Sequence, residues 1–111
     1  DKIIGCIIFS QPSFFDALEL RYFVFQSEYR SKGIMTEALS LFSGYLFATR
    51  KMNRLQLSIP DYHQASIAVA KKCGFIFEGI SRQASFNRGT YIDLCLYSML
   101  RSECKHLDKV L

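Results

Sequence analysis

Residues 29–36 read YRSKGIMT, and the other elements of the fold are predicted outward from this segment. It lies between an apolar run, Leu18 to Phe25, that reads as a strand and a helical pattern that begins at Gly33. A strand-to-helix loop with a glycine lets the backbone approach an anion closely, and the N–H groups of the helix's first turn can bind a pyrophosphate. Arg30 and Lys32 would add positive charge at its rim. The segment is therefore either a phosphate-binding loop or a solvated basic turn.

Apolar residues on both sides of this loop predict its neighbouring elements. Ahead of it, Ile3 to Phe9 predicts a buried strand that pairs with the strand 18–25. Behind it, a long buried helix is expected to end near Arg50, and its apolar stripe is expected at Ile34, Ala38, Leu41, Tyr45 and Ala48, widened by Met35, Leu39, Phe42 and Leu46.

The second half of the chain predicts a strand, a helix and a hairpin. Leu55 to Ile59 alternates apolar and polar residues, as a strand against a core does. A helix is expected from near His63 to Gly74, which can take the left-handed conformation while Phe75 packs back. Residues 75–86 and 91–100 predict two strands joined by a glycine-containing loop at 87–89. The order β-β-α-β-α-β-β defines a mixed α/β sheet fold.

Composition narrows the class of protein. The chain has 111 residues, half of them hydrophobic, which predicts a single domain over residues 1–111. No apolar run approaches the roughly 20 residues of a membrane span, and the first ten residues lack the features of a signal peptide, so a cytoplasmic protein with no membrane partner is expected. The four cysteines are widely spaced without a CxxC pair, which favours buried thiols over a metal site or disulfides. A net charge of +4 does not imply a nucleic-acid partner.

Three motifs resemble those of the GNAT superfamily of N-acetyltransferases. Arg30-x-x-Gly33-x-Met35 resembles the R/Q-x-x-G-x-G/A loop that binds pyrophosphate in that family, and residues 33–39 are similar to its RimJ/RimL branch. Residues 63–79 are similar to the family's N-x-x-S helix that ends in G-F and continues with E-G, and residues 91–100 resemble the last strand of the branch. The resemblance spans residues 4–103. No residues of the sequence match the strand, helix pair and further strand that come before these motifs in the family. We therefore expect the chain to be a shortened, cofactor-binding part of a GNAT domain.

This resemblance implies transfer of an acetyl group from acetyl-coenzyme A to a primary amine, without a metal, and a protein N-terminal α-amino group is the expected acceptor. It also implies that the sheet splays beside the cofactor, so that the pantetheine arm pairs with strand backbone at the gap. The implied cofactor-binding residues are Phe25, Arg30, Ser31, Lys32, Gly33, Ile34, Met35, Thr36, His63 and Ser66.

Ser66 and Tyr97 are the expected catalytic residues. Ala70 occupies the position where many GNAT enzymes carry the tyrosine that protonates the leaving thiolate. Ser66, four residues earlier on the same helix face, is favoured as the group that steadies the thiolate, and the alternative is a serine bonded within its own first turn. Tyr97 is otherwise a core tyrosine, and His63 is otherwise a capping residue.

Two other functions stay open at this point. A non-catalytic cofactor-binding or assembly module is favoured by the absent front segment and by Ala70. A nucleic-acid binder that uses the basic residues between Arg50 and Arg54 is the weaker alternative. The strand Ile3 to Phe9 is expected at an exposed sheet edge, which would invite pairing of two copies into a homodimer.

Overall fold

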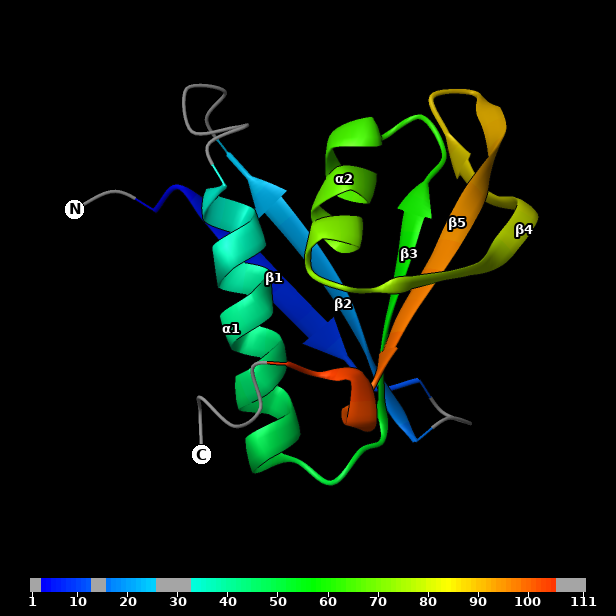
Figure 1. Cartoon of the computed structure of the whole chain (residues 1–111). Helices are drawn as coiled ribbons and strands as arrows, with labels where there is room; N and C mark the ends of the chain where they lie inside the picture. The colour runs from blue at the N-terminus through cyan, green and yellow to red at the C-terminus, as the bar shows by residue number, and fades with distance from the viewer. Residues whose placement is uncertain (1–2, 13–15, 26–32, 106–111) are drawn as a thin grey trace.

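The computed structural model describes residues 3–12, 16–25 and 33–105. It contains five strands, two α-helices and a short 3-10 turn, η2, in an order that confirms the predicted β-β-α-β-α-β-β arrangement (Figure 1). The elements are β1 (Gly5–Ser10), β2 (Ala17–Val24), α1 (Ile34–Thr49), β3 (Arg54–Pro60), α2 (Gln64–Lys72), β4 (Ile76–Asn87), β5 (Thr90–Leu100) and η2 (Arg101–Glu103). None of the helices in the described part of the chain is long and apolar enough to cross a membrane.

The five strands form one mixed sheet in the order β1-β2-β3-β5-β4. β2 and β3 are parallel and are joined through α1, whereas the other neighbouring pairs are antiparallel. β1 lies at one edge, as expected, and its pairing with a second copy stays a prediction.

The sheet opens between its two parallel strands. β2 and β3 pair only from Ala17 opposite Arg54 to Glu19 opposite Gln56. Beyond Gln56, β3 stays paired with β5 as far as Pro60, while β2 follows β1, and the two strands diverge toward their carboxyl ends (Figure 1). This confirms the splayed sheet that the resemblance implied.

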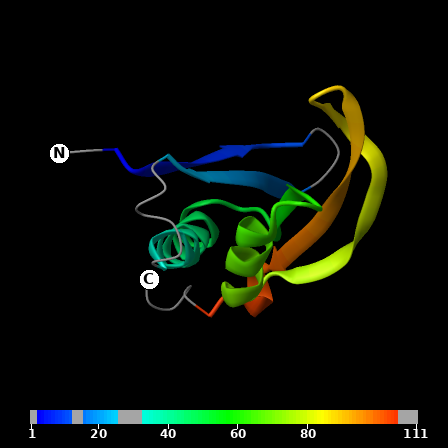
Figure 2. The ribbon, with the colours of Figure 1, turned by 90° about the horizontal axis from the view of Figure 1, so that it is seen from above.

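Both helices lie on the same face of the sheet, and the core fills the space between them and the strands (Figure 2). The alternation in β3 turns Leu55, Leu57 and Ile59 toward the helices, where each is at most 5% exposed. α2 contributes Ile67 and Ala70 to the same core. Burial of each of these leucine and isoleucine side chains stabilises the fold by about 1.5–3 kcal/mol.

The apolar stripe expected on α1 was confirmed at Met35, Leu39 and Leu46 and was wrong at its centre. Leu41 and Tyr45 are about half exposed, and the buried face carries Met35, Leu39, Ser40, Ser43, Gly44, Leu46 and Phe47. Apolar residues occupy most of the circumference of this helix, so their spacing alone could not fix the buried side. The buried side is marked by small residues, because Ser40, Ser43 and Gly44 are all buried on the packed side of the helix.

The ends of α2 and of the β4–β5 hairpin follow the sequence closely. Gly74 has a φ of 90° after the helix, its N–H donates to the carbonyl of Lys71, and the N–H of Phe75 donates to that of Ala70. This pair of bonds is the glycine-dependent Schellman ending of a helix. The hairpin turn is shorter than predicted, because Asn87 still belongs to β4, and its two residues, Arg88 and Gly89, both have positive φ as a type I′ turn requires.

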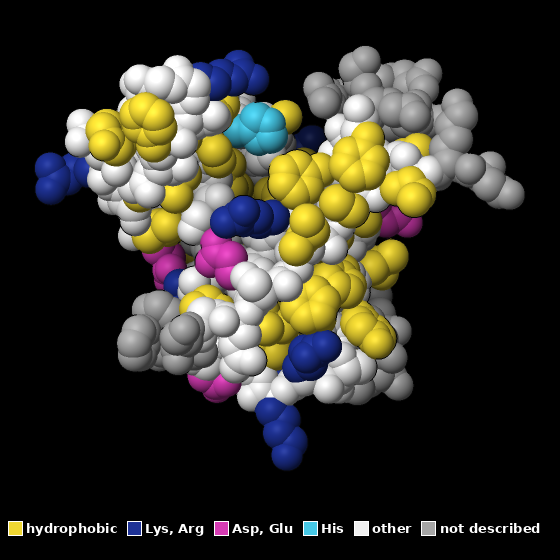
Figure 3. Space-filling view, turned by 180° about the vertical axis from the view of Figure 1, so that it is seen from behind, with side chains coloured by type: hydrophobic (Ala, Val, Ile, Leu, Met, Phe, Trp, Pro, Cys, Tyr) yellow, Lys and Arg dark blue, Asp and Glu magenta, His cyan; other side chains and the backbone are white. Residues whose placement is uncertain are grey.

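The opposite face of the sheet carries exposed hydrophobic side chains and a polar chain of contacts (Figure 3). Arg54 donates to Glu78 at 3.0 Å and to Gln56 at 2.9 Å, and Gln56 donates to Glu19 at 2.9 Å. The Arg54 guanidinium holds the pKa of the Glu78 carboxyl below its usual range. Arg50, in the same basic segment, lies over the ring of Phe9 at 4.9 Å. Both arginines of the candidate nucleic-acid cluster therefore make contacts within the chain.

Arg101 ties the turn after β5 to the end of α1. Its guanidinium donates to the carbonyl oxygens of Arg50 at 2.6 Å and Met52 at 2.7 Å, and also to that of Phe47. These carbonyls lie at or beyond the last turn of α1, where helix geometry leaves them without helical partners.

Replacing Arg101 with methionine is expected to lower the free energy of unfolding by about 2–3 kcal/mol, since hydrogen bonds from a charged donor to several carbonyls are lost together. Arg101→Lys should recover part of that loss, because one ammonium cannot reach all three oxygens. Urea denaturation of the parent and the two variants measures the effect. A loss below about 0.5 kcal/mol in the methionine variant would contradict the structural role.

Candidate active site

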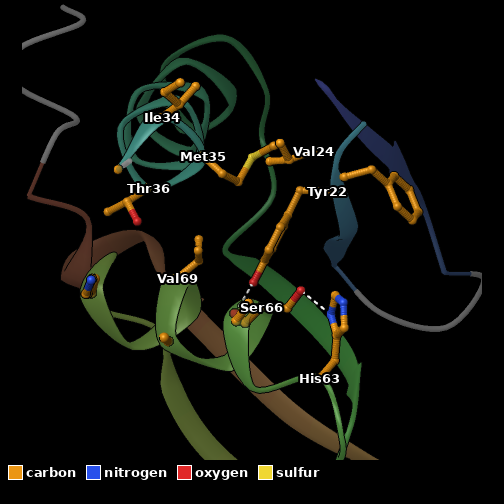
Figure 4. A pocket seen from close by; sticks show the side chains of 13 residues that line it. Tyr22, Val24, Ile34, Met35, Thr36, His63, Ser66 and Val69 are labelled. Carbon is orange, nitrogen blue, oxygen red and sulfur yellow. Dashed lines mark hydrogen bonds between the residues drawn. The ribbon is translucent and has the colours of Figure 1, made fainter. Parts of the chain in front are cut away.

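A pocket of about 340 Å³ lies where β2 has separated from β3 (Figure 4). Three elements meet there, namely the carboxyl end of β2, the first turn of α1 and one side of α2 along its length. The lining residues are Tyr22, Phe23, Val24, Gly33, Ile34, Met35, Thr36, His63, Ala65, Ser66, Ala68, Val69 and Lys72. Six of the ten expected cofactor-binding residues are thus in one place, and they come from two helices that the sequence separates by about 30 positions.

The first turn of α1 presents backbone N–H groups at the pocket. Gly33 is the residue that precedes the helix, with a φ of 75°, and its carbonyl accepts the N–H of Glu37 at 3.0 Å. It has no side chain with which to cap the turn, so the N–H groups of Ile34, Met35 and Thr36 are left to other partners. With the positive end of the helix dipole behind them, they suit an anion.

Ser66 and His63 stand together at the start of α2. The Ser66 hydroxyl is hydrogen-bonded to Nδ1 of His63, and the serine is 9% exposed (Figure 4). The hydroxyl therefore bonds to the side chain of the residue before the helix and not to its own first turn. If Nδ1 carries the proton, His63 donates and the Ser66 hydroxyl hydrogen is free to point elsewhere. That tautomer is the one in which Ser66 can donate to a bound sulfur.

Tyr22 is a pocket residue that the sequence analysis missed. Its hydroxyl donates to the carbonyl oxygen of Ser66 at 2.6 Å, across the gap in the sheet (Figure 4). Burial, with smaller contributions from Cys73 and Tyr97, raises the pKa of the Tyr22 phenol well above its ordinary value. Strand alternation could have found it, because Leu18, Leu20 and Tyr22 share the face that packs on the helices.

Lys72, near the end of α2, is a second lining residue that the sequence analysis missed. It is the one cation among the described lining residues, and a Lys in the last turn of a helix also complements the helix dipole. Its place in the pocket depends on how α1 and α2 pack, which helical spacing alone does not reveal.

Two expected site residues, Phe25 and Tyr97, lie outside this lining. Phe25 follows β2 and is 54% exposed, and its backbone N–H donates to Ile4. Tyr97 lies in β5, 4% exposed, with its ring 5.4 Å from that of Phe77. It is placed as a core tyrosine that faces Tyr22, and burial raises the pKa of its phenol. Arg30, Ser31 and Lys32 fall outside the described residues, so their expected contacts stay predictions, as does a catalytic part for Tyr97.

Cys73 joins the two helices beneath the pocket. Its sulfur accepts a hydrogen bond from Ser40 at 3.3 Å and donates to the carbonyl of Thr36 at 3.3 Å. Burial raises the pKa of this thiol, so it stays protonated. Cys6, Cys73, Cys95 and Cys104 are all free, and no metal-binding cluster is found among the described residues.

The crystal structure of an acetyltransferase of the GNAT family from Bacillus anthracis matches this fold with a TM-score of 0.82 at 25% identity, covering 90% of this chain and 60% of that one. The family model described as an acetyltransferase (GNAT) domain matches residues 1–76. The chain belongs to this family.

Relatives within the family agree with the resemblance to its RimJ/RimL branch. The chain is 32% identical over 85 residues to the Bacillus subtilis protein named ribosomal N-acetyltransferase YdaF, covering 77% of this chain and 46% of that protein. The crystal structure of ribosomal-protein-S5-alanine acetyltransferase from Vibrio fischeri matches with a TM-score of 0.84 at 27% identity, covering 94% of this chain and 57% of that one. RimL, a ribosomal L7/L12 α-N-protein acetyltransferase solved with coenzyme A, matches with a TM-score of 0.72 at 26% identity, covering 77% and 48%. The chain thus spans about half the length of these proteins.

Proposed function

We propose that the protein binds acetyl-coenzyme A in this pocket and transfers the acetyl group to a primary amine, with a protein N-terminal α-amino group as the acceptor. The proposal rests on one observation. The α1 amino terminus, the part of β2 that no longer pairs with β3, and Ser66 all line the same pocket. The coenzyme A in the RimL structure and the acceptors in the names of the relatives support it.

Each part of the pocket suits one part of the cofactor. The N–H groups at Ile34–Thr36 are suited to the pyrophosphate, and Lys72 adds a positive charge on the α2 side. β2 no longer pairs with β3 over residues 20–23, so the strand backbone there is available for the amides of the pantetheine arm. The thioester then lies near Ser66.

In this reaction the protein mainly has to hold the amine and the thioester in the right positions. A neutral amine attacks the thioester carbonyl, the carbon–sulfur bond breaks, and the thiolate leaves while the amine loses a proton. In the proposed mechanism, the Ser66 hydroxyl donates a hydrogen bond to the thiolate as charge develops there, and His63 Nδ1 holds that hydroxyl in place. Ala70 is fully buried and offers no phenol for this task.

A non-catalytic cofactor-binding module is the second candidate. It is favoured by Ala70, which offers no phenol to the leaving thiolate. We further propose that either form works in the cytoplasm, which the protonated, buried Cys73 thiol supports.

One experiment separates the two candidates. Coenzyme A affinity is measured by calorimetry, and acetyl transfer is measured on the same sample with a peptide, a polyamine and a small amine as acceptors. The proposed function predicts micromolar to millimolar binding and turnover that favours the peptide. Binding without turnover on any acceptor would support the module, and absence of binding would contradict both.

A further inference from the structure

A hydrogen bond from Tyr22 to Ser66 crosses the opening of the sheet. Tyr22 lies three residues beyond Glu19, the last residue at which β2 pairs with β3. Paired strands lie about 4.8 Å apart, whereas here the strands have separated and a whole helix turn stands opposite β2. The length of a tyrosine side chain lets its hydroxyl reach the Ser66 carbonyl at 2.6 Å.

Ser66 is held at two points as a result. Its carbonyl oxygen accepts from Tyr22 on β2, and its hydroxyl bonds to His63 at the start of its own helix. The two contacts act on different atoms of the same residue, so together they limit both the place of the α2 turn and the direction of the hydroxyl. A hydroxyl must lie within about 0.5 Å of its productive position to serve a transition state well.

The state of the phenol makes this contact persistent. The phenol of Tyr22 is partly buried, and desolvation disfavours its ionised form. It therefore remains a hydrogen-bond donor across the neutral range, and the Ser66 carbonyl can only accept. A phenylalanine would fill nearly the same space but would leave the carbonyl without this donor.

We propose that Tyr22 is a positioning residue for acyl transfer, whose hydroxyl holds the first turn of α2 across the open gap and so sets the place of Ser66. This inference rests on the function proposed above, since it concerns the same pocket and the same reaction. It adds a residue that acts through Ser66 and not on the substrate.

The test compares Tyr22→Phe with a matched control, Tyr45→Phe, which removes a phenol from an exposed position on α1 outside the pocket. Tyr22→Phe is expected to lower kcat by about 10- to 100-fold, the range that follows from a displacement of reacting groups, while KM for acetyl-coenzyme A changes less than about 2-fold. Tyr45→Phe should leave both constants unchanged. A Tyr22→Phe variant with the parent's kcat overturns the proposal.

A double-mutant cycle shows whether Tyr22 acts through Ser66. If it does, Tyr22→Phe has no further effect on kcat once Ser66 is alanine, because there is no hydroxyl left to place. Effects that multiply would mean that Tyr22 acts on the reaction by another route, which overturns the positioning claim. A purely structural loss would instead lower the folded fraction, and it is recognised by a fall in the melting temperature with kcat per folded molecule unchanged.

Hydrogen exchange separates failure of this inference from failure of the proposed function. Tyr22→Phe is expected to speed amide exchange about 5-fold or more within Ile67–Ala70, the segment that follows the tethered carbonyl, with no change in β5. Unchanged exchange there overturns the tether whatever the activity. If the parent protein turns over no amine, the proposed function is contradicted, and so is the effect of Tyr22 on catalysis. Faster exchange in Tyr22→Phe would then still show that the hydrogen bond holds α2 in place.

Discussion

Replacing Gly33 with aspartate is expected to abolish measurable coenzyme A binding, a loss of at least about 100-fold in affinity, or about 2.7 kcal/mol. The new carboxylate would stand at the start of α1, beside the N–H groups that are proposed to hold the pyrophosphate. Two like charges a few ångströms apart repel by several kcal/mol near a protein surface. The negative charge would also occupy the positive end of the helix dipole in place of the ligand.

Steric crowding is not the reason for this expectation. A Cβ added to Gly33 would meet no atom of the described residues within 4 Å, so the cost lies in the φ of 75° and in the charge. Gly33→Asn separates these two effects, because asparagine has the size of aspartate and tolerates left-handed φ values similarly, yet is neutral. We expect the asparagine variant to bind within about 10-fold of the parent.

Calorimetric titration of coenzyme A into the three proteins measures the difference. Circular dichroism of each sample shows that α1 still forms, since aspartate is itself a good residue before a helix. Equal affinities for the parent and the aspartate variant would remove the first turn of α1 from the binding site.

Replacing Ser66 with alanine is expected to lower kcat by about 10- to 1000-fold while coenzyme A affinity stays nearly the same. A hydrogen bond to a thiolate in a site shielded from water is worth a few kcal/mol in the transition state and little in the ground state, because the thioester sulfur is a weak acceptor. The substitution leaves the Ser66 carbonyl in place, so the bond from Tyr22 persists. The fold around α2 should therefore be kept.

Ser43→Ala is the matched control for this measurement. Its hydroxyl is fully buried on α1, has no hydrogen-bond partner within the described part of the chain, and does not line the pocket. We expect that variant to keep the parent's kcat and to be at least as stable, since an unsatisfied buried hydroxyl is removed. If Ser66→Ala is as active as the parent, Ser66 has no part in the mechanism. If it loses folding with no separate rate effect, the serine is structural.

Short-range features of this fold could be predicted from the sequence. Gly74 and Phe75 end α2 by bonds that reach back only a few residues, and Arg88 and Gly89 form a turn whose conformation their own backbones determine. The start of α1 after Gly33 could also be predicted, because a strand followed by glycine and a helical pattern needs no tertiary information, whereas pyrophosphate binding there stays a prediction.

Features that join distant segments could not be predicted in the same way. Tyr22 and Ser66 are 44 positions apart, and Arg101 reaches Phe47 across 54, so no local pattern marks either contact. The buried side of α1 was misjudged for a related reason, since only its packing against α2 and the sheet selects Ser43 over Tyr45. Alternation in β5 places Tyr97 in the core beside Phe77, a contact between strands that spacing alone does not reveal, and its expected catalytic part stays a prediction.

The most direct test of the central claim is a titration of isotope-labelled protein with coenzyme A, followed by amide chemical shifts in NMR spectra. If the pocket binds the cofactor, the amides of Met35, Thr36 and Ser66 shift together with one dissociation constant, while those of η2, on the far side of the core, stay in place. Shifts that gather instead around Gln56 and Glu78 on the opposite face of the sheet, or no shifts at millimolar coenzyme A, would contradict the claim.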